Sequence, residues 1–380
     1  MNNLIYLDNA SKTIPYPEVI ELYNAVTSSF FANPSSIHVE GRKASREIDK
    51  AREELLSLMK LKNHQVIYVN SATEANNLAV KGYALKNKNR GNHLITTSYE
   101  HPSVLEAFRQ LENEFGFKVT YLNPDRDGII SSKMIEEALT KDTILVSIMA
   151  VNNEIGAINP IEEIASLLKN YPKIAFHVDA AQAFTKLEKE INYSDVDLLT
   201  ISSHKIHGLI GCAALIKKKN INLLPLLSGG GQEEGNRSGT NDAASIIAFS
   251  KAIKISLAKE KEHYNHVKEL SDILLEYLSN NKDKYELNVP SAINPYIINF
   301  SPTAKKSSVV VEALSNKGIM VSSTSACHSS KEKGSYVVKS LGKSDAISNN
   351  TIRVSLSYMN TKEEMEIFIK ALDEIIGAIR

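Results

Sequence analysis

The sequence is poor in cysteine, has no excess of either charge, and has no long hydrophobic run. Its 380 residues include two cysteines, Cys212 and Cys327, which are too few for a disulfide framework and fit a reducing cytoplasm. The 44 basic residues balance 44 acidic ones, so charge gives no reason to expect nucleic acid or an anionic membrane as a partner. No apolar run approaches the ~18 residues of a membrane helix, and the first residues lack the parts of a signal peptide. We therefore expect a cytoplasmic protein with no membrane and no direct nucleic-acid partner.

Length and patterning predict an α/β fold. A chain of 380 residues is too long for one small core, so two domains are expected. Short apolar runs alternate with segments of helical periodicity, which is typical of a parallel sheet covered on both faces. The expected strands are 65–69, 93–97, 118–122, 143–151, 174–178, 197–201 and 212–216, and the helices between them are about 75–87, 103–115, 132–140 and 160–170. We predict a large domain with a mostly parallel seven-stranded sheet flanked by helices.

The pattern changes in the last third of the chain. A helical stretch at about 242–281 leads into shorter strands and helices, which predict a smaller α+β domain. Its expected strands are within 286–300, 319–322 and 351–356, and its helices are about 307–317, 333–341 and 361–379. We expect the large domain to span residues 16–257 and the small domain to combine residues 1–15 with 258–380.

A lysine at the end of an expected strand is the first candidate for chemistry. The apolar run 196–201 ends in Ser202-Ser203-His204-Lys205. A lysine amine forms a Schiff base with pyridoxal phosphate (PLP), and neighbouring hydroxyl and imidazole groups can bind the phosphate. The same tetrapeptide could also be an ordinary loop after a strand, and by itself it does not decide between the two.

Three other strand ends carry polar residues that suit the same cofactor. Ser71 and Glu74 have capping-box spacing after an apolar strand, and such a helix start can bind a phosphate. His101 follows the strand 93–97 and could stack on a cofactor ring or exchange protons. Asp179, with Gln182 one turn on, could pair with a pyridinium nitrogen. Each is also common as a plain helix cap or turn.

Two further segments suit an amino-acid substrate and a reactive thiol. Asn153, in the polar turn after the strand 143–151, and Arg353, on an otherwise apolar strand, could bind a carboxylate. A turn cap and a snorkelling arginine are the ordinary alternatives. Cys327 lies in a run of small polar residues, which predicts an exposed, mobile and reactive thiol. Cys212 lies among apolar residues and is typical of a buried structural cysteine.

Taken together, these segments resemble the NifS/IscS-type cysteine desulfurases, which are PLP enzymes of aminotransferase fold. The resemblance covers nearly the whole chain, because its motifs are spread along the chain and occur in the same order as in the family. The motifs are Tyr6-Leu7-Asp8-Asn9-Ala10, Asn33-Pro34-Ser35-Ser36, Ala72-Thr73-Glu74, Glu100-His101, Asn152-Asn153-Glu154-Ile155-Gly156, His177-Val178-Asp179-Ala180, Ser202-Ser203-His204-Lys205, Gly229-Gly230-Gly231-Gln232-Glu233, Arg237-Ser238-Gly239-Thr240, Ser325-Ala326-Cys327 and Ile352-Arg353-Val354-Ser355.

The resemblance implies a cofactor role for most of the candidates. Lys205 would form the Schiff base with PLP, and His101 would stack on its ring. Asp179 would pair with the ring nitrogen, and Gln182 would reach the ring hydroxyl. The residues implied for the phosphate are Ala72, Thr73, Ser202, His204 and, from the second subunit of a homodimer, Thr240.

The resemblance also implies the reaction. Asn153 and Arg353 would bind the carboxylate of L-cysteine, and Cys327 would take its sulfur as a persulfide and release L-alanine. The sulfur would pass to an acceptor protein, either an iron–sulfur scaffold or a tRNA-thiolation enzyme. Another PLP lyase, such as a selenocysteine lyase, and a non-catalytic sulfur-carrier or interaction protein are the alternatives. Cys327 argues against the lyase, and the intact Lys205 argues against a protein without catalysis.

Two segments depart from the family pattern. Ser11-Lys12-Thr13-Ile14-Pro15 replaces the usual run of small residues and threonine and adds one residue. Gly208-Leu209-Ile210-Gly211 replaces a turn of the glycine-proline-lysine type. The first departure leaves open what the N-terminal segment contributes to the site.

Overall fold

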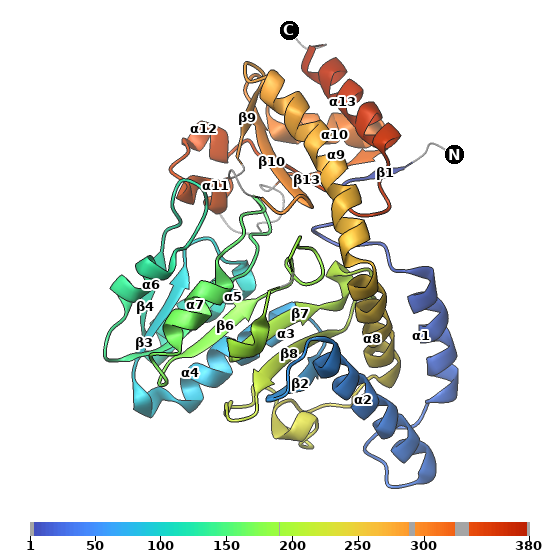
Figure 1. Ribbon diagram of the computed structural model, residues 1–380, viewed down its shortest axis with the longest axis vertical. Helices are drawn as coiled ribbons and strands as arrows, with labels where there is room; N and C mark the ends of the chain where they lie inside the picture. Colours follow the sequence, from blue (N-terminus) through green and yellow to red (C-terminus); the bar gives the residue numbers. More distant parts are fainter. Residues whose placement is uncertain (1–3, 190, 289–292, 324–333, 378–380) are drawn as a thin grey trace.

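A seven-stranded sheet forms the centre of the protein (Figure 1). The computed structural model describes residues 4–189, 191–288, 293–323 and 334–377. The strands are β2 (His64–Val69), β3 (His93–Thr97), β4 (Lys118–Leu122), β5 (Thr143–Met149), β6 (Ala175–Asp179), β7 (Leu198–Ser202) and β8 (Ala213–Lys218), in the order β2-β8-β7-β6-β5-β3-β4. Strand β8 runs antiparallel to both of its neighbours, and the other adjacent pairs are parallel. The predicted mostly parallel seven-stranded sheet is confirmed.

Helices bury both faces of this sheet. Adjacent residues of β5, Leu145 and Val146, belong to two different hydrophobic cores, as expected where successive side chains point to opposite faces. One face is covered by α3 (Ala72–Asn77), a π-helical turn (Leu78–Gly82), α4 (Tyr83–Lys86) and α5 (Pro102–Phe115). The other is covered by α2 (Val39–Leu58), α6 (Ser132–Ala138), α7 (Ile161–Leu168) and α8 (Ala243–Ala258), with α1 (Pro17–Ser29) packed on α8.

The C-terminal third forms a smaller α+β part. Its antiparallel sheet has the order β12-β13-β10-β9, and the N-terminal strand β1 pairs in parallel with β11, so both ends of the chain belong to this part (Figure 1). The strands are β1 (Ile5–Tyr6), β9 (Tyr285–Leu287), β10 (Ile297–Pro302), β11 (Ile319–Met320), β12 (Ser322–Ser323) and β13 (Ile352–Ser355). The helices are α9 (Glu260–Asn280), α10 (Ser307–Asn316), α11 (Tyr336–Ser340), α12 (Asp345–Ser348) and α13 (Lys362–Gly377).

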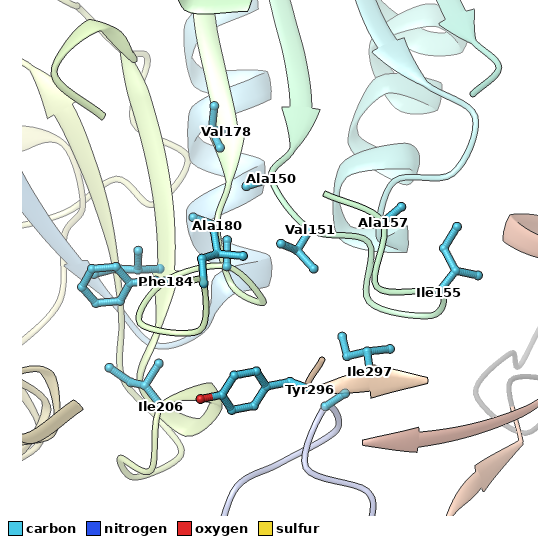
Figure 2. Packing of buried hydrophobic residues seen from close by; sticks show 14 of the residues in the cluster. Ala150, Val151, Ile155, Ala157, Val178, Ala180, Phe184, Ile206, Tyr296 and Ile297 are labelled. Carbon is cyan, nitrogen blue, oxygen red and sulfur yellow. The ribbon is translucent and has the colours of Figure 1, made fainter. Parts of the chain in front are cut away.

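The two parts share a hydrophobic core. Figure 2 shows Tyr296 and Ile297, where β10 begins, facing the turns that carry Val151, Phe184 and Ile206, and all five belong to one buried cluster. The predicted domain limits, 16–257 and 1–15 with 258–380, remain predictions. Within the described part of the chain, no helix has both the length and the apolar character needed to span a bilayer.

Two details differ from the sequence-based expectations. The expected helical stretch 242–281 is broken at Lys259, whose ψ of 6° ends α8 before α9 begins. Helix α8 packs on α1 and α2, whereas α9 packs on β9 and α13, so the break lets the chain pass from one part to the other. The expected strand 319–322 is two short strands in different sheets, because β11 pairs with β1 and β12 with β13.

Candidate active site

A cavity of about 320 Å³ lies at the carboxyl ends of the parallel strands, where ligands bind in open α/β sheets. The turns after β3, β5, β6 and β7, the start of α3, the N-terminal segment and β13 all contribute to its walls. Nine of the twelve predicted site residues line it: Ala72, Thr73, His101, Asn153, Asp179, Gln182, His204, Lys205 and Arg353. The structure therefore brings together residues that are as much as 281 positions apart, from Ala72 to Arg353.

The other three predicted residues do not line the cavity. Ser202 is buried at the end of β7, and its Oγ lies 3.1 Å from Nδ1 of His204. Thr240 is exposed and borders a separate small hollow beside Cys212. Cys327 lies outside the described residues. Cys212 itself is 3% exposed, and burial raises the pKa of its thiol well above the ordinary value.

The N-terminal segment lies against the lysine loop. Nζ of Lys205 donates to the backbone carbonyls of Ala10, at 2.5 Å, and Ser11, at 2.9 Å. The backbone N–H and the hydroxyl of Thr13 both donate to the carbonyl of His204. Burial and the neighbouring Lys205 lower the pKa of His204 to about 4, so this imidazole is neutral at pH 7. The departure from the family motif thus falls on a segment that contacts the lysine directly.

A buried amide joins two of the predicted cofactor ligands. Nδ2 of Asn76, a fully buried residue of α3, donates to Oδ2 of Asp179 at 2.8 Å and to Oγ of Ser103 at 2.9 Å. The backbone N–H of Ser103 donates to Nδ1 of His101 at 3.1 Å, and that of Ala181 donates to Oδ1 of Asp179 at 3.0 Å. Sequence reasoning missed Asn76, although an asparagine one turn into a capped helix at a strand end was the available signal.

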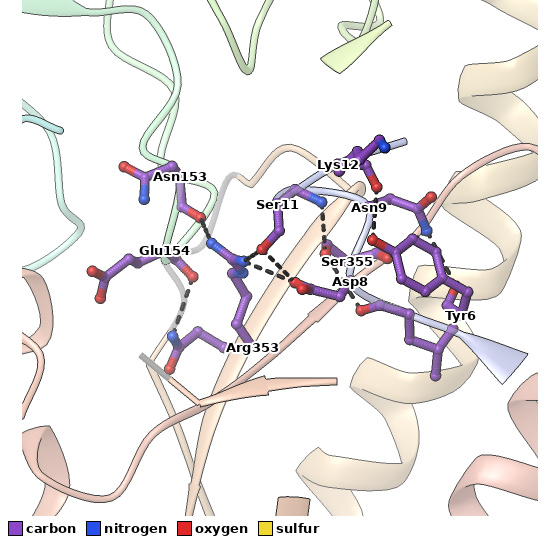
Figure 3. A network of polar contacts seen from close by, with 12 residues as sticks. Tyr6, Asp8, Asn9, Ser11, Lys12, Asn153, Glu154, Arg353 and Ser355 are labelled. Carbon is purple, nitrogen blue, oxygen red and sulfur yellow. Dashed lines mark hydrogen bonds and ion pairs between the residues drawn. The ribbon is translucent and has the colours of Figure 1, made fainter. Parts of the chain in front are cut away.

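Arg353 is held by a second network (Figure 3). Its Nη1 donates to the carbonyl of Asn153 at 2.9 Å, and its Nη2 donates to Oδ1 of Asp8 at 2.9 Å and to Oγ of Ser11 at 2.8 Å. Ser11 Oγ in turn donates to Oδ1 of Asp8 at 2.9 Å. Asp8 and Ser11 were not among the predicted site residues, because nothing near them in the sequence indicates a contact with β13.

Glu154 lines the cavity, and two further buried ionisable groups, Glu100 and Lys186, interact electrostatically with its lining residues Asp179 and Lys205. Burial, together with the negative charge of Asp179, raises the pKa of Glu100 to about 8. Burial raises the pKa of Glu154 to about 7. Burial, with the positive charge of Lys205, lowers the pKa of Lys186 to about 7. Low solvent access therefore disfavours the charged form of each of these three groups.

The residues of the cavity fit PLP. The Lys205 amine can bind its aldehyde, and the buried Asp179 carboxylate can pair with its ring nitrogen. The helical run that begins at Ala72 offers backbone N–H groups to a phosphate, and Ser71 caps it by accepting from the N–H of Glu74 at 3.1 Å. An amine, a carboxylate and an anion-binding helix start are the three features that this cofactor requires.

Comparisons with known proteins agree with this geometry. The family model Aminotransferase class-V matches residues 5–368. A NifS/IcsS protein homolog from Lactobacillus delbrueckii subsp. bulgaricus is 38% identical over 98% of this chain and 97% of its own length. A cysteine desulfurase IscS from Dictyoglomus turgidum is 36% identical over 100% of this chain and 96% of its own.

Comparison with solved structures also finds NifS-like proteins. A NifS-like protein superposes with a TM-score of 0.91 at 31% identity, over 99% of this chain and 100% of that chain. A NifS-like protein from Rickettsia africae superposes with a TM-score of 0.87 at 29% identity, over the same shares. The predicted fold and resemblance are confirmed. The chain belongs to the class-V aminotransferase family, in its group of PLP-dependent, NifS/IscS-type cysteine desulfurases.

Proposed function

We propose that this cysteine desulfurase binds PLP through Lys205 and receives the sulfur of L-cysteine on Cys327. The observation that carries the proposal is that one cavity brings together the Lys205 amine, the Asp179 carboxylate and the His101 imidazole, which come from three strand ends. PLP, when bound, supplies an electron sink for the bonds of the substrate's α-carbon. Asp179 keeps the ring nitrogen protonated, which strengthens that sink.

The same geometry supports the proposed phosphate ligands. Ala72 and Thr73 offer the backbone N–H groups of a helix start. His204 is neutral, and Oγ of Ser202 lies 3.1 Å from its Nδ1. We assign the proton of this contact to Ser202, which leaves the ring proton on Nε2, where it can donate to a phosphate. We assign the remaining contact to Thr240 of a second subunit, because Thr240 is exposed and lies outside this cavity.

His101 is the proton-transfer group of the proposal. It caps α5, and its Nδ1 accepts the N–H of Ser103, so the neutral ring carries its proton on Nε2. Gln182 donates to the carbonyl of Ala10 at 2.8 Å and lines the cavity, and it would hold the ring hydroxyl of the cofactor. Asn153 and Arg353, which also line the cavity, are assigned to the substrate carboxylate.

The sulfur step balances without an external oxidant. The Cys327 thiolate attacks the sulfur of L-cysteine, an S–S bond forms, and the C–S bond of the substrate breaks. The electron pair of that bond stays on the substrate carbon, which takes a proton and leaves as L-alanine. The transferred sulfur remains as a persulfide. Support for Cys327 comes from the Ser325-Ala326-Cys327 motif, since the residue lies outside the described part of the chain.

The proposal includes partners and a location. We infer a homodimer, a cytoplasmic location, and an acceptor protein that is either an iron–sulfur scaffold or a tRNA-thiolation enzyme. The relatives named IscS support an iron–sulfur role. Capture of bound proteins from the native cell by a persulfide-loaded enzyme identifies the acceptor, and recovery of neither kind of acceptor contradicts this part of the proposal.

Covalent trapping tests the lysine. Borohydride reduction of the purified yellow protein should fix the cofactor on Lys205 and remove the colour. Peptide mapping locates the label, and a label on Lys186 or Lys217 would overturn the assignment. A colourless protein that binds no PLP would instead favour the non-catalytic carrier.

Substitution of the two cysteines tests the persulfide. The variant Cys327→Ser should bind PLP and L-cysteine with normal changes in absorbance but release almost no sulfide or L-alanine. Cys212→Ser is the matched control, because that thiol is buried away from the cavity, and it should stay nearly as active as the parent. Turnover of L-cysteine by Cys327→Ser at the parental rate would exclude the persulfide, and a preference for L-selenocysteine would favour a selenocysteine lyase.

A further inference from the structure

We propose that Ser11 is a positioning residue of the carboxylate subsite: its hydroxyl sets the orientation in which Arg353 binds the carboxylate of an α-amino acid. The inference rests on the proposed function, in which Arg353 binds that carboxylate. Ser11 lies in the N-terminal segment where the sequence departs from the family motif, and it lines the same cavity as Arg353 and Lys205.

The hydroxyl of Ser11 occupies a fixed place between two charges (Figure 3). Its oxygen accepts from Nη2 of Arg353 at 2.8 Å, and its proton points to Oδ1 of Asp8 at 2.9 Å. A hydroxyl has one proton to donate, and that proton is used here, so the rotation of the hydroxyl is determined. Arg353 is 5% exposed, and contacts of this kind are stronger where water is scarce.

Ser11 also moderates the ion pair between Asp8 and Arg353. Both Nη2 of Arg353 and Oγ of Ser11 donate to the same carboxylate oxygen, Oδ1 of Asp8. Part of the negative charge of Asp8 is therefore satisfied by the serine. Without this hydroxyl, Asp8 would neutralise the guanidinium alone and would compete more strongly with a substrate carboxylate.

The backbone of Ser11 connects this subsite with the reacting amine. Its carbonyl accepts from Nζ of Lys205 at 2.9 Å, while its side chain contacts Arg353. One residue thus touches the group that binds the cofactor and the group that binds the carboxylate.

Binding of L-alanine to the holoenzyme tests the inference without turnover. The cofactor absorbance is followed during titration with L-alanine and with ethylamine, which has the amine and lacks the carboxylate. Ser11→Ala should bind L-alanine about threefold to tenfold more weakly, which is the net effect of losing one ordinary hydrogen bond, and should bind ethylamine like the parent. With L-cysteine, KM should rise more than kcat falls. Ser11→Thr, which keeps a hydroxyl, should recover most of the affinity. Ser28→Ala, at an exposed serine of α1, is the matched control.

The variant Arg353→Lys distinguishes a failure of the proposed role of Ser11 from a failure of the proposed role of Arg353. If Arg353→Lys weakens L-alanine binding and Ser11→Ala adds little in the double variant, Ser11 acts through Arg353 and the inference is supported. If Arg353→Lys weakens binding and Ser11→Ala binds like the parent, the inference is overturned and the proposed function stands. Additive losses in the double variant also overturn it. If Arg353→Lys binds L-alanine like the parent, the proposed role of Arg353 fails first. PLP content and absorbance spectrum verify that each variant is folded.

Discussion

Asn76 joins two functional side chains through the two protons of one amide. It donates to Asp179 and to Ser103, and Ser103 donates to the ring of His101. The orientation of Asp179, the carboxylate proposed to pair with the cofactor nitrogen, therefore depends on a residue that has no proposed contact with the cofactor or the substrate. Buried carboxylates of this kind need such donors, because an unpaired buried charge is costly.

We predict that Asn76→Ala lowers the free energy of unfolding by about 1–3 kcal/mol, because it leaves the buried Asp179 without one donor. PLP should also be lost more readily, and denaturant unfolding and PLP release by dialysis measure the two effects. Asn77→Ala is the control: Asn77 is half-buried, and its amide donates to the carbonyls of Thr73 and Ser103. Equal PLP retention in both variants would show that Asn76 has no role at the site.

The buried carboxyl of Glu100 should make the stability of the protein depend on pH. Its carboxyl is fully buried, and its pKa is raised from 4.5 to about 8 by burial and by Asp179. A raised pKa in the folded state means that the folded protein binds the proton more tightly, so the stabilisation is present below pH 4.5 and is lost as pH rises through about 8.

Glu100→Gln replaces the carboxyl by a neutral group of the same shape, and its Oε1 can still accept from Thr97 and from the N–H of Met149. The variant should therefore lose less stability than the parent between pH 5 and pH 8, by on the order of a few kcal/mol. Chemical denaturation at both pH values measures the difference. Parallel pH profiles for parent and variant would contradict the prediction.

The sequence predicted part of the site because of where its residues lie along the chain. Lys205, Asp179 and His101 each follow an apolar strand, and the carboxyl ends of parallel strands meet at one edge of the sheet. Ser11 and Asp8 could not be found in this way, since their partner Arg353 lies more than 340 residues away on a strand of the smaller sheet. Contacts of that range depend on how the two parts pack, which no local pattern indicates.

At the scale of elements, the strands of the large sheet were predictable and some boundaries were not. Buried parallel strands are continuous apolar runs between polar turns, so their positions follow from composition. The break between α8 and α9 has no such signal, because residues 255–262 contain neither glycine nor proline. The sequence pattern also does not indicate that residues 319–323 divide into β11 and β12, because this division depends on pairing with β1 and β13.

The turn that carries Lys205 has no room for a side chain at Gly208. A Cβ added to Gly208 would lie 2.1 Å from Oγ and 2.9 Å from the backbone carbonyl of Ser203. Gly208→Ala must therefore displace the turn between β7 and β8, and we expect a PLP affinity at least severalfold lower and a loss of about 1–3 kcal/mol in stability. Gly377→Ala on α13 is the control, because nothing lies within 4 Å of its added Cβ. Titration of both apoenzymes with PLP measures the two affinities. Equal PLP affinities of the two variants would contradict the expectation.

At the scale of the whole molecule, the site of one chain is expected to be completed by a second. The exposed Thr240 is assigned to the cofactor phosphate of the other subunit, so PLP retention should depend on protein concentration. Thr240→Ala should release PLP more readily than the parent, and Thr27→Ala, at an exposed threonine of α1, should not. Analytical ultracentrifugation with absorbance detection follows assembly and cofactor together. A monomer with full activity at high dilution would contradict both expectations.

The pairing of Asp8 with Arg353 also has a consequence for biosynthesis. These two residues are 345 positions apart, so at about 5–20 residues per second the ribosome adds Arg353 roughly 20–70 seconds after Asp8. Until then the large sheet, whose last strand ends at Lys218, can form while the proposed carboxylate subsite lacks Arg353. We expect nascent chains stalled before β13 to bind amino acids poorly even when supplied with PLP. The proposed substrate subsite is therefore complete only after β13 has been synthesised.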